Sequence, residues 1–264
     1  MSDFGVDLHR EGDDGVAWLT LRNRGRLNAV RFEMWEAIAA TLETLGRDPS
    51  VRVLVVRGDG DQAFASGADI TEFETRRKDA ASAAIYEDTT ARAFNALTSF
   101  ARPLVAMVHG VCVGGGLAIA ASADIRIAAD DARFALPPAR LGLGYHFNGV
   151  ERVVGIVGPS AASEIFFTAR QYTAPEALQI GLVNQVLPKA ELEAYTTRYV
   201  AGIAANAPLT IQAAKRAIAE TQRPADARDL AGLRAMIAGC FESADYAEGV
   251  QAFLEKRRPR FRGV

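Results

Sequence analysis

The sequence predicts an α/β fold built on a mostly parallel sheet and followed by a helical C-terminal third. Short apolar runs of strand length alternate with stretches of helical periodicity as far as about residue 159. Such alternation is typical of βαβ units, whose strands run parallel. Beyond that residue the strand patterns stop and helical segments follow. The 264 residues are enough for one large domain, or for a main domain with a small appendage.

The N-terminal residues predict a hairpin and then a helix. Residues 6–9 and 16–21 alternate apolar and polar side chains around a turn at residues 12–15, which indicates two antiparallel strands. Residues 32–45 carry apolar side chains at helical spacing and are followed by Gly46 and Pro49. We therefore expect the first helix there.

Three buried strands are expected in the middle of the chain. Residues 51–56 form an apolar run closed by a Gly-Asp-Gly turn, and the Ala-rich residues 80–100 predict a helix. Residues 103–108 predict the next strand, which leads through a glycine loop into an apolar helix at residues 117–121. Residues 124–128 predict a further strand.

The C-terminal third carries helical patterns, including those at residues 190–205, 208–220 and 227–241. A last helix is expected to begin at Asp245, an N-cap residue followed three positions later by the acidic Glu248. One apolar stripe runs along this helix and contains Tyr246, Val250, Phe253 and Leu254.

Composition excludes several classes of protein. Hydrophobic residues make up 49% and charged residues 23%, which is ordinary for a globular protein and too apolar for disorder. A net charge of −2 argues against a nucleic-acid binder, and the basic residues 256–260 are the kind of run that is usually a solvated tail.

The chain shows no sign of secretion or of a membrane span. Cys112 and Cys240 are far apart, so we expect no disulfide, no cysteine metal site and a cytoplasmic location. The N-terminus lacks the basic and apolar regions of a signal peptide. The apolar residues 104–121 are interrupted by His109 and three glycines, which favours a buried strand, loop and helix over a membrane span.

Two glycine-containing turns are the candidate chemical sites. Residues 64–70 read Phe-Ala-Ser-Gly-Ala-Asp-Ile, and residues 109–116 end in three glycines. A glycine run that opens a helix exposes backbone N–H groups beside the positive end of the helix dipole, where an oxyanion or a phosphate is stabilised. Neither turn has the spacing of a nucleotide-binding loop. Each turn alone could be a tight turn without function.

Together the two turns resemble the crotonase (enoyl-CoA hydratase/isomerase) family, and the similarity covers nearly the whole chain. Further landmarks that agree are Asn23-Arg24, residues 27–30, 123–128, 134–137, 170–184 and 253–257. The resemblance implies a crotonase-like ββα spiral core over residues 1–190 that holds the acyl-CoA site. It also implies a helical C-terminal trimerisation region over residues 191–264, giving a homotrimer or a dimer of trimers.

The resemblance also assigns the binding residues. The backbone N–H groups of Ala68 and Gly115 would hold the oxygen of a thioester enolate, and losing one such donor typically costs about 10²–10³ in rate. The partner would be a small-molecule acyl-CoA; no other cofactor, no metal, no nucleic acid and no membrane are expected. The residues that would bind coenzyme A or line its path are Arg24, Arg26, Ala65, Ser66, Gly67, Asp69, Ile70, Gly114, Phe253 and Lys256.

The sequence departs from the hydratase pattern at both catalytic glutamates. Ala118 and Pro138 stand at these positions, and neither side chain can act as an acid or a base. Tyr145 matches a tyrosine of the methylmalonyl-CoA decarboxylase branch, and His146 falls where dienoyl-CoA isomerases carry an aspartate. Both could instead be ordinary packing or loop residues, and for His109 we expect a structural hydrogen bond.

Three functions therefore remain open at this point. The first is a lyase that forms the enolate by removing CO₂ from a 2-carboxyacyl-CoA, a reaction that needs no base. The second is a hydratase or isomerase that uses Tyr145, His146 or a water in place of the glutamates. The third is an acyl-CoA-binding protein without catalytic activity.

Overall fold

Two β-sheets organise the protein, whose computed structural model describes residues 3–10, 14–76 and 78–264. Among these residues the larger sheet has six strands in the order β1-β2-β3-β5-β7-β10, and the smaller has four in the order β4-β6-β8-β9. The larger sheet contains β1 (Phe4–Arg10), β2 (Val16–Asn23), β3 (Val53–Gly58), β5 (Leu104–Val108), β7 (Ile125–Ala129) and β10 (Gln185–Leu187). The smaller contains β4 (Ala63–Ala65), β6 (Val111–Val113), β8 (Arg133–Ala135) and β9 (Tyr172–Thr173).

The chain repeats a ββα unit. Each of β3, β5 and β7 belongs to the larger sheet and is followed by a short strand of the smaller sheet, β4, β6 and β8 respectively. A helical segment comes next in every case, and successive units pair in parallel in both sheets. This is a spiral of ββα turns, so the predicted fold class is confirmed.

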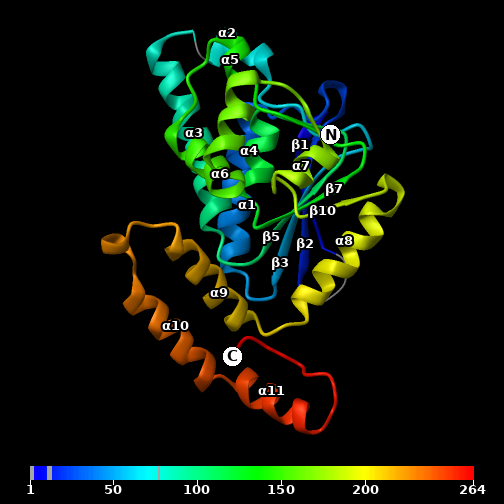
Figure 1. Cartoon of the computed structure of the whole chain (residues 1–264), viewed down its shortest axis with the longest axis vertical. Coiled ribbons are helices and arrows are strands. Elements are labelled where there is room, and N and C mark those ends of the chain that lie inside the picture. The colour runs from blue at the N-terminus through cyan, green and yellow to red at the C-terminus, as the bar shows by residue number, and fades with distance from the viewer. Residues whose placement is uncertain (1–2, 11–13, 77) are drawn as a thin grey trace.

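Helices cover both faces of the larger sheet (Figure 1). On one side lie α1 (Phe32–Arg47), α3 (Ala80–Ser99), α4 (Gly115–Ser122) and α6 (Phe147–Thr168), and on the other lies α8 (Lys189–Ala204). Along β3 the side chains alternate: Val53 and Val55 join the apolar cluster under α8, while Leu54 and Val56 join the larger cluster on the opposite face. Burial on both faces explains why these strands are continuous apolar runs.

The last three helices lie at one end of the protein (Figure 1). Figure 1 shows α9 (Pro208–Thr221), α10 (Leu230–Glu242) and α11 (Ala244–Leu254) along the end of the molecule opposite to α2 (Phe73–Arg76) and α5 (Pro138–Leu141). No residue of α10 is buried, and the α11 stripe of Tyr246, Val250, Phe253 and Leu254 is exposed. The remaining short helices are η1 (Arg24–Arg26), η2 (Ile70–Glu72), α7 (Ala174–Gln179) and η3 (Ala225–Ala227).

The elements deviate from the predicted ones at a few places. The hairpin, the first helix and the three central strands are confirmed, although β3 begins at Val53 and the hairpin turn at residues 12–13 lies outside the described residues. The prediction that strands stop near residue 159 is wrong. Strands β9 and β10 span only two and three residues, and they exist through pairing with β8 and β7 rather than through a local pattern.

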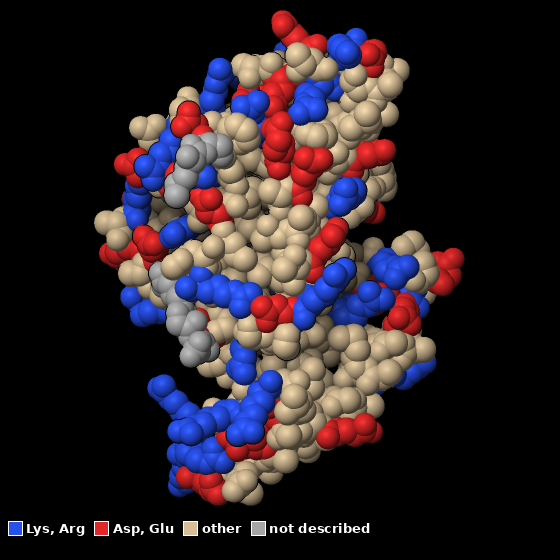
Figure 2. Space-filling view, turned by 180° about the vertical axis from the view of Figure 1, so that it is seen from behind, with Lys and Arg blue, Asp and Glu red and all other residues tan. Residues whose placement is uncertain are grey.

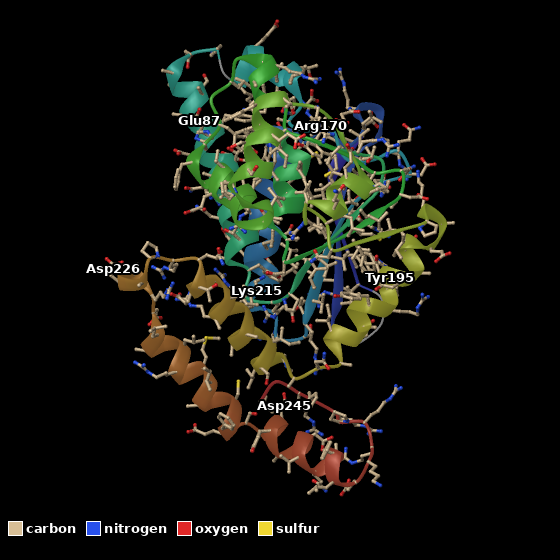
Figure 3. The ribbon with its side chains drawn as sticks, viewed as in Figure 1. Glu87, Arg170, Tyr195, Lys215, Asp226 and Asp245 are labelled. Atoms are coloured by element: carbon tan, nitrogen blue, oxygen red, sulfur yellow. The ribbon has the colours of Figure 1, made fainter. Side chains whose placement is uncertain are left out.

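The predicted cap of the last helix is also wrong. Ser243 caps α11, because its hydroxyl accepts a hydrogen bond from the Tyr246 N–H at 3.1 Å. Asp245 lies inside the helix and is buried, where its carboxylate accepts from the backbone N–H groups of Arg262 and Gly263 at 2.6 and 2.8 Å. Figure 3 labels Asp245 beside this returning C-terminal chain. The tail is thereby tied to α11.

No helix in the described part of the chain combines the length and the apolar character that crossing a lipid bilayer requires.

Candidate active site

The turn after β4 directs one backbone N–H away from the neighbouring segment at Val30. The Val30 N–H donates to the Gly67 carbonyl at 2.7 Å, and the Asp69 N–H donates to the Val30 carbonyl at 3.0 Å. Ala68 lies between these two bonds in a parallel bridge, so its own N–H is directed away from Val30. Gly67 makes the turn possible with a φ of +117°, a conformation that favours glycine.

The start of α4 supplies a second free N–H beside the first. Gly115 is the first residue of α4, and the N–H groups of a first helical turn have no acceptor within the helix. A Cβ atom on Gly115 would lie 3.3 Å from the Ala68 nitrogen. Both residues are partly accessible. The two N–H groups therefore lie side by side within reach of a ligand.

Tight packing holds this pair together. A Cβ atom on Gly116 would lie 2.2 Å from the Ala65 carbonyl oxygen, so α4 can approach β4 this closely only with glycine at that position. Gly114 precedes the helix at φ +53° and ψ −119°, a backbone conformation that side chains with a Cβ rarely adopt. Fixed donors at a helix N-terminus can stabilise an oxygen that gains negative charge during a reaction.

One of the two positions that lack a glutamate, Ala118, lies close to this pair. Ala118 is one turn after Gly115 on the same face of α4, and Pro138 opens α5; both are half-buried. The carboxylates that follow Ala68 in sequence are already engaged. Asp69 accepts from the Thr71 N–H and hydroxyl at 3.1 and 2.6 Å.

Glu72 is engaged in the same way, because it binds the Arg31 guanidinium at 2.9 Å and the Phe32 N–H at 2.8 Å. Its carboxylate therefore caps the start of α1. Glu72 was not predicted from the sequence. Ile70, a predicted binding residue, lies between these two carboxylates with 65% of its surface exposed.

Tyr145 and His146 lie in different environments. The Tyr145 ring packs against Phe166, with 5.1 Å between ring centroids, and burial raises the pKa of its hydroxyl to about 12. The hydroxyl therefore stays protonated near neutral pH and can donate a hydrogen bond but cannot act as a base. The His146 carbonyl accepts from the first turn of α6, while its side chain is exposed.

The predicted coenzyme A residues near the N-terminus are brought together. The Ser66 hydroxyl donates to the Arg26 carbonyl at 3.0 Å, which places the segment after β2 against the turn at Gly67. Arg24 forms a two-pronged ion pair with Asp59 at 2.5 and 2.8 Å, and this partner lowers the pKa of Asp59. Among the described residues the Arg26 side chain has no ion-pair partner, so it is the more available cation of the two.

Asn28 fixes the shape of this segment, and in the sequence it stands out only by its place in the family pattern. It is buried in a left-handed conformation with φ +55°. Its side-chain amide donates to the carbonyls of Asp59 and Ala63 at 2.9 and 2.8 Å. The segment and β4 are therefore joined through one side chain.

Phe253 and Lys256 are not brought to the site within one chain. Arg52 donates to the Phe261 carbonyl at 2.5 Å and so fixes the tail that follows α11. Arg52 lies just before the start of β3, whereas the turn at Ala68 comes after the end of β3 and the short β4. Phe253 is 83% exposed. Within one chain these two residues therefore do not lie at the turn.

The basic tail is partly paired. Arg257 binds Glu248 through two bonds of 2.7 and 2.9 Å. The tail and α11 enclose a hollow of about 940 Å³, and Figure 2 shows basic side chains gathered at this end of the molecule. Residues 256–260 are all exposed, as expected of a solvated run, and the tail lies remote from the glycine turns (Figure 1).

His109 and metal binding complete the comparison with the sequence. The expected hydrogen bond of His109 is not made at Nε2, which is buried and has no partner among the described residues. Burial lowers the pKa of this imidazole. Within the described ranges, no cluster of three or more His, Cys, Asp or Glu side chains is arranged to hold a metal ion.

Known proteins are similar to this chain in sequence and in fold. Residues 11–264 match the family model described as enoyl-CoA hydratase/isomerase. The chain belongs to this family. It is 34% identical over 248 residues to the 2,3-dehydroadipyl-CoA hydratase of Escherichia coli, covering 94% of the chain and 95% of that protein. It is 32% identical over 248 residues to the methylmalonyl-CoA decarboxylase of the same organism, covering 91% and 92% respectively.

The fold of the family is equally well matched. A crystal structure of an enoyl-CoA hydratase/carnithine racemase from Magnetospirillum magneticum superposes with a TM-score of 0.92 and 34% identity, over 100% of this chain and 97% of that one. The protein is thus an enzyme-family member whose relatives are named for acyl-CoA substrates, mostly as hydratases. The relatives include hydratases and a decarboxylase, so the reaction has to be inferred from the geometry of the site residues.

Proposed function

We propose that this protein removes CO₂ from a 2-carboxyacyl-CoA through a thioester enolate held by the N–H groups of Ala68 and Gly115. The observation that carries the proposal is the combination of this donor pair with Ala118 and Pro138, which leave no titratable side chain where hydratases place their acid and base. Decarboxylation forms the enolate without a base. The donor pair is therefore sufficient for this step, even though Ala118 and Pro138 supply no acid or base.

Apart from one proton, the decarboxylation uses only atoms and electrons of the substrate. The bond between C2 and the carboxylate breaks, its electron pair forms the C1–C2 double bond, and the negative charge moves to the thioester oxygen. CO₂ leaves, and C2 then takes up a proton from solvent or from the Tyr145 hydroxyl. Because burial raises the pKa of this hydroxyl to about 12, it is suited to orienting the carboxylate as a donor. An apolar surrounding favours the loss of charge from the carboxylate.

Coenzyme A would be bound from two sides. Arg26 and the backbone of Ala65 to Ala68 belong to one chain, and their contacts are consistent with a path for the nucleotide and pantetheine. Phe253 and Lys256 would come from a neighbouring copy. No other cofactor enters this proposal. With both cysteines free, we also place the protein in the cytoplasm.

The two alternatives have weaker support. A hydratase or isomerase fits the names of most relatives, but it would need the exposed His146, the protonated Tyr145 or a water to transfer protons. A binding protein without activity would not require the close packing that aligns the two donors. The decarboxylase of Escherichia coli is 32% identical to this chain and the hydratase of the same organism 34%, so sequence identity favours neither reaction, and the proposal rests on the residues of the site.

Product analysis tests the proposal. The protein is incubated separately with methylmalonyl-CoA, crotonyl-CoA and a dienoyl-CoA, and the products are separated and weighed by mass spectrometry. We expect CO₂ release from methylmalonyl-CoA. Crotonyl-CoA hydration should be orders of magnitude slower than usual, since acid and base groups contribute about 10²–10⁴ each. Hydration near the common ~10 s⁻¹ would favour the second function. Binding without any product would favour the third.

A further inference from the structure

A tryptophan of α1 lies against the donor pair. Trp35 is 1% exposed, and its ring carbons Cζ2 and Cη2 lie 3.3 and 3.4 Å from the position that a Cβ would occupy on Gly115. The same position is 3.3 Å from the Ala68 nitrogen. On another side the indole packs against Phe94 of α3, with 5.3 Å between ring centroids. From the sequence, Trp35 was assigned only to the apolar stripe of its helix.

The indole N–H of Trp35 is a buried donor without an acceptor. Within the described residues, Nε1 has no hydrogen-bond partner. Buried polar atoms are nearly always paired, so an exception calls for a reason. Trp18 provides a comparison, because its Nε1 is not among the buried unpaired atoms of the described chain. It is 3% exposed and belongs to the apolar cluster under α8, with the Arg57 guanidinium 5.0 Å from its ring.

The indole is buried beneath residues that are themselves partly accessible. Gly115, Ala118 and Phe94 are each partly accessible, although Trp35 is not. Gly115 and Ala118 share one face of the helix and carry almost no side-chain bulk. Only the small residues of this face would separate a ligand lying over it from the indole. The ring atom nearest to Gly115 is Cζ2, and Nε1 is two bonds away from Cζ2.

We propose that the Trp35 indole N–H is a substrate-binding donor that selects acyl groups with an oxygen acceptor on C2. This inference rests on the proposed function, because it takes the thioester oxygen to be bound by Ala68 and Gly115. The carbon C2 is bonded to the thioester carbonyl carbon, so a carboxylate on C2 would lie near Ala68, Gly115 and the indole beside them. A neutral donor orients this carboxylate without holding its charge as firmly as an arginine or lysine, whose strong pairing would oppose the loss of CO₂.

The test uses binding, so that it does not depend on turnover. The ligands are the sulfonate isostere of methylmalonyl-CoA, which cannot lose CO₂, and butyryl-CoA, which has no acceptor on C2. The protein contains two tryptophans, so the Trp18→Phe variant with ¹⁵N-labelled indole shows the Trp35 signal alone. Affinities for both esters are measured by calorimetry for the wild type, Trp35→Phe and the matched control Trp18→Phe.

The sulfonate ester should move the Trp35 indole proton downfield, whereas butyryl-CoA should leave it near its free position. Trp35→Phe should bind the sulfonate ester about 10-fold to 100-fold more weakly and butyryl-CoA unchanged, as expected for one lost bond to a charged group. Trp18→Phe should bind both esters like the wild type.

An indole signal that moves equally with both esters would overturn the inference, as would equal affinity losses for both. If Trp35→Phe does not fold, the indole signal in Trp18→Phe decides alone. Failure of the proposed function is a separate result: the wild type would release no CO₂ from methylmalonyl-CoA while the indole still distinguished the two esters.

Discussion

Three consecutive glycines have three different physical roles at the donor pair. Gly114 takes up a backbone conformation that other residues rarely adopt, and Gly115 leaves the space between the Ala68 nitrogen and the Trp35 ring. Gly116 allows α4 to contact the Ala65 carbonyl. A side chain at any of these positions should change the direction or the spacing of the N–H groups, because Gly114 has a positive φ and a Cβ on Gly115 or Gly116 would meet a packed ring or backbone atoms closely.

The substitution Tyr145→Phe removes the hydroxyl and keeps the ring, so it tests the contribution of the hydroxyl alone. The ring packs against Phe166, so folding and coenzyme A binding should be preserved. If the hydroxyl orients the substrate carboxylate, CO₂ release from methylmalonyl-CoA should slow by roughly 10–150-fold, the effect of one lost hydrogen bond to a charged group. Steady-state kinetics of CO₂ release measure this.

His146→Ala is the matched comparison for that experiment. The side chain is exposed and enolate formation by decarboxylation needs no base, so this variant should lose less activity than Tyr145→Phe. The opposite ranking, with Tyr145→Phe silent and His146→Ala inactive, would contradict the decarboxylase and favour proton-transfer chemistry.

His109 should make the stability of the protein depend on pH. Burial lowers its pKa, and Lys189 and Arg57 act in the same direction, while Asp131 and Asp61 oppose them. The unfolded chain takes up a proton near pH 6.5, before the folded protein does. The folded state is therefore favoured above that pH and loses stability as the pH falls from there towards the lowered value.

The melting temperature should accordingly fall more between pH 7.5 and 5.5 for the wild type than for His109→Gln, which cannot take up a proton. Differential scanning fluorimetry at several pH values measures the two slopes. Parallel slopes would show that the imidazole is not the group responsible.

At the scale of elements, the sequence predicts what is local and misses what depends on pairing. The helices α1, α3, α8 and α9 carry their apolar periodicity in the chain, so their ends were placed within about two residues. Strands β9 and β10 have no such pattern and form only because β8 and β7 offer unpaired edges. The helix α4 begins at Gly115, inside a run that predicts a loop, because contact with β4 favours the helical turn.

The candidate site follows the same division. Glycine spacing alone left function undecided, and the resemblance to a family was needed to select Ala68 and Gly115. The closeness of their N–H groups is a property of two turns that are 47 positions apart in the chain, so only the folded structure shows it. Trp35 could not be selected from the sequence, because its spacing is that of an ordinary core residue.

Gly116→Ala should disrupt the contact between α4 and β4. A Cβ there would lie 2.2 Å from the Ala65 carbonyl oxygen and 2.8 Å from its carbonyl carbon, both of them backbone atoms. Overpacking of this kind costs about 1–3 kcal/mol in stability, and displacement of the donors should lower activity by a factor of about 10² or more. Thermal unfolding and CO₂ release measure the two effects.

Gly46→Ala in α1 is the control for that substitution, since no atom lies within 4 Å of its added Cβ. It should leave activity unchanged and stabilise the helix by about 0.5–1 kcal/mol. If Gly116→Ala kept full activity, close contact between α4 and β4 would not be needed to align the donors.

At the scale of the whole molecule, we expect the C-terminal helices to contact a second copy of the chain. Helix α10 has no buried residue, and Phe241, Phe253 and Leu254 are 63%, 83% and 75% exposed. Isolated exposed apolar residues are common, but a contiguous set along two helices marks an interaction surface. The separation of Phe253 and Lys256 from the rest of the candidate coenzyme A site fits a second copy as the partner. The division into residues 1–190 and 191–264 stays a prediction of the same kind.

The last prediction is that the protein assembles through this surface into a trimer or a pair of trimers. Light scattering at micromolar concentration should give three or six times the chain mass of 28.3 kDa. Phe253→Asp should lower this mass and weaken coenzyme A binding together, because a charge would be buried at the contact and the same side chain would be lost from the neighbouring site. Leu8→Asp, on the 44%-exposed side chain of β1, is the control and should change neither quantity. A monodisperse monomer that binds acyl-CoA with full affinity would contradict both the assembly and the placement of Phe253 in a neighbour's site.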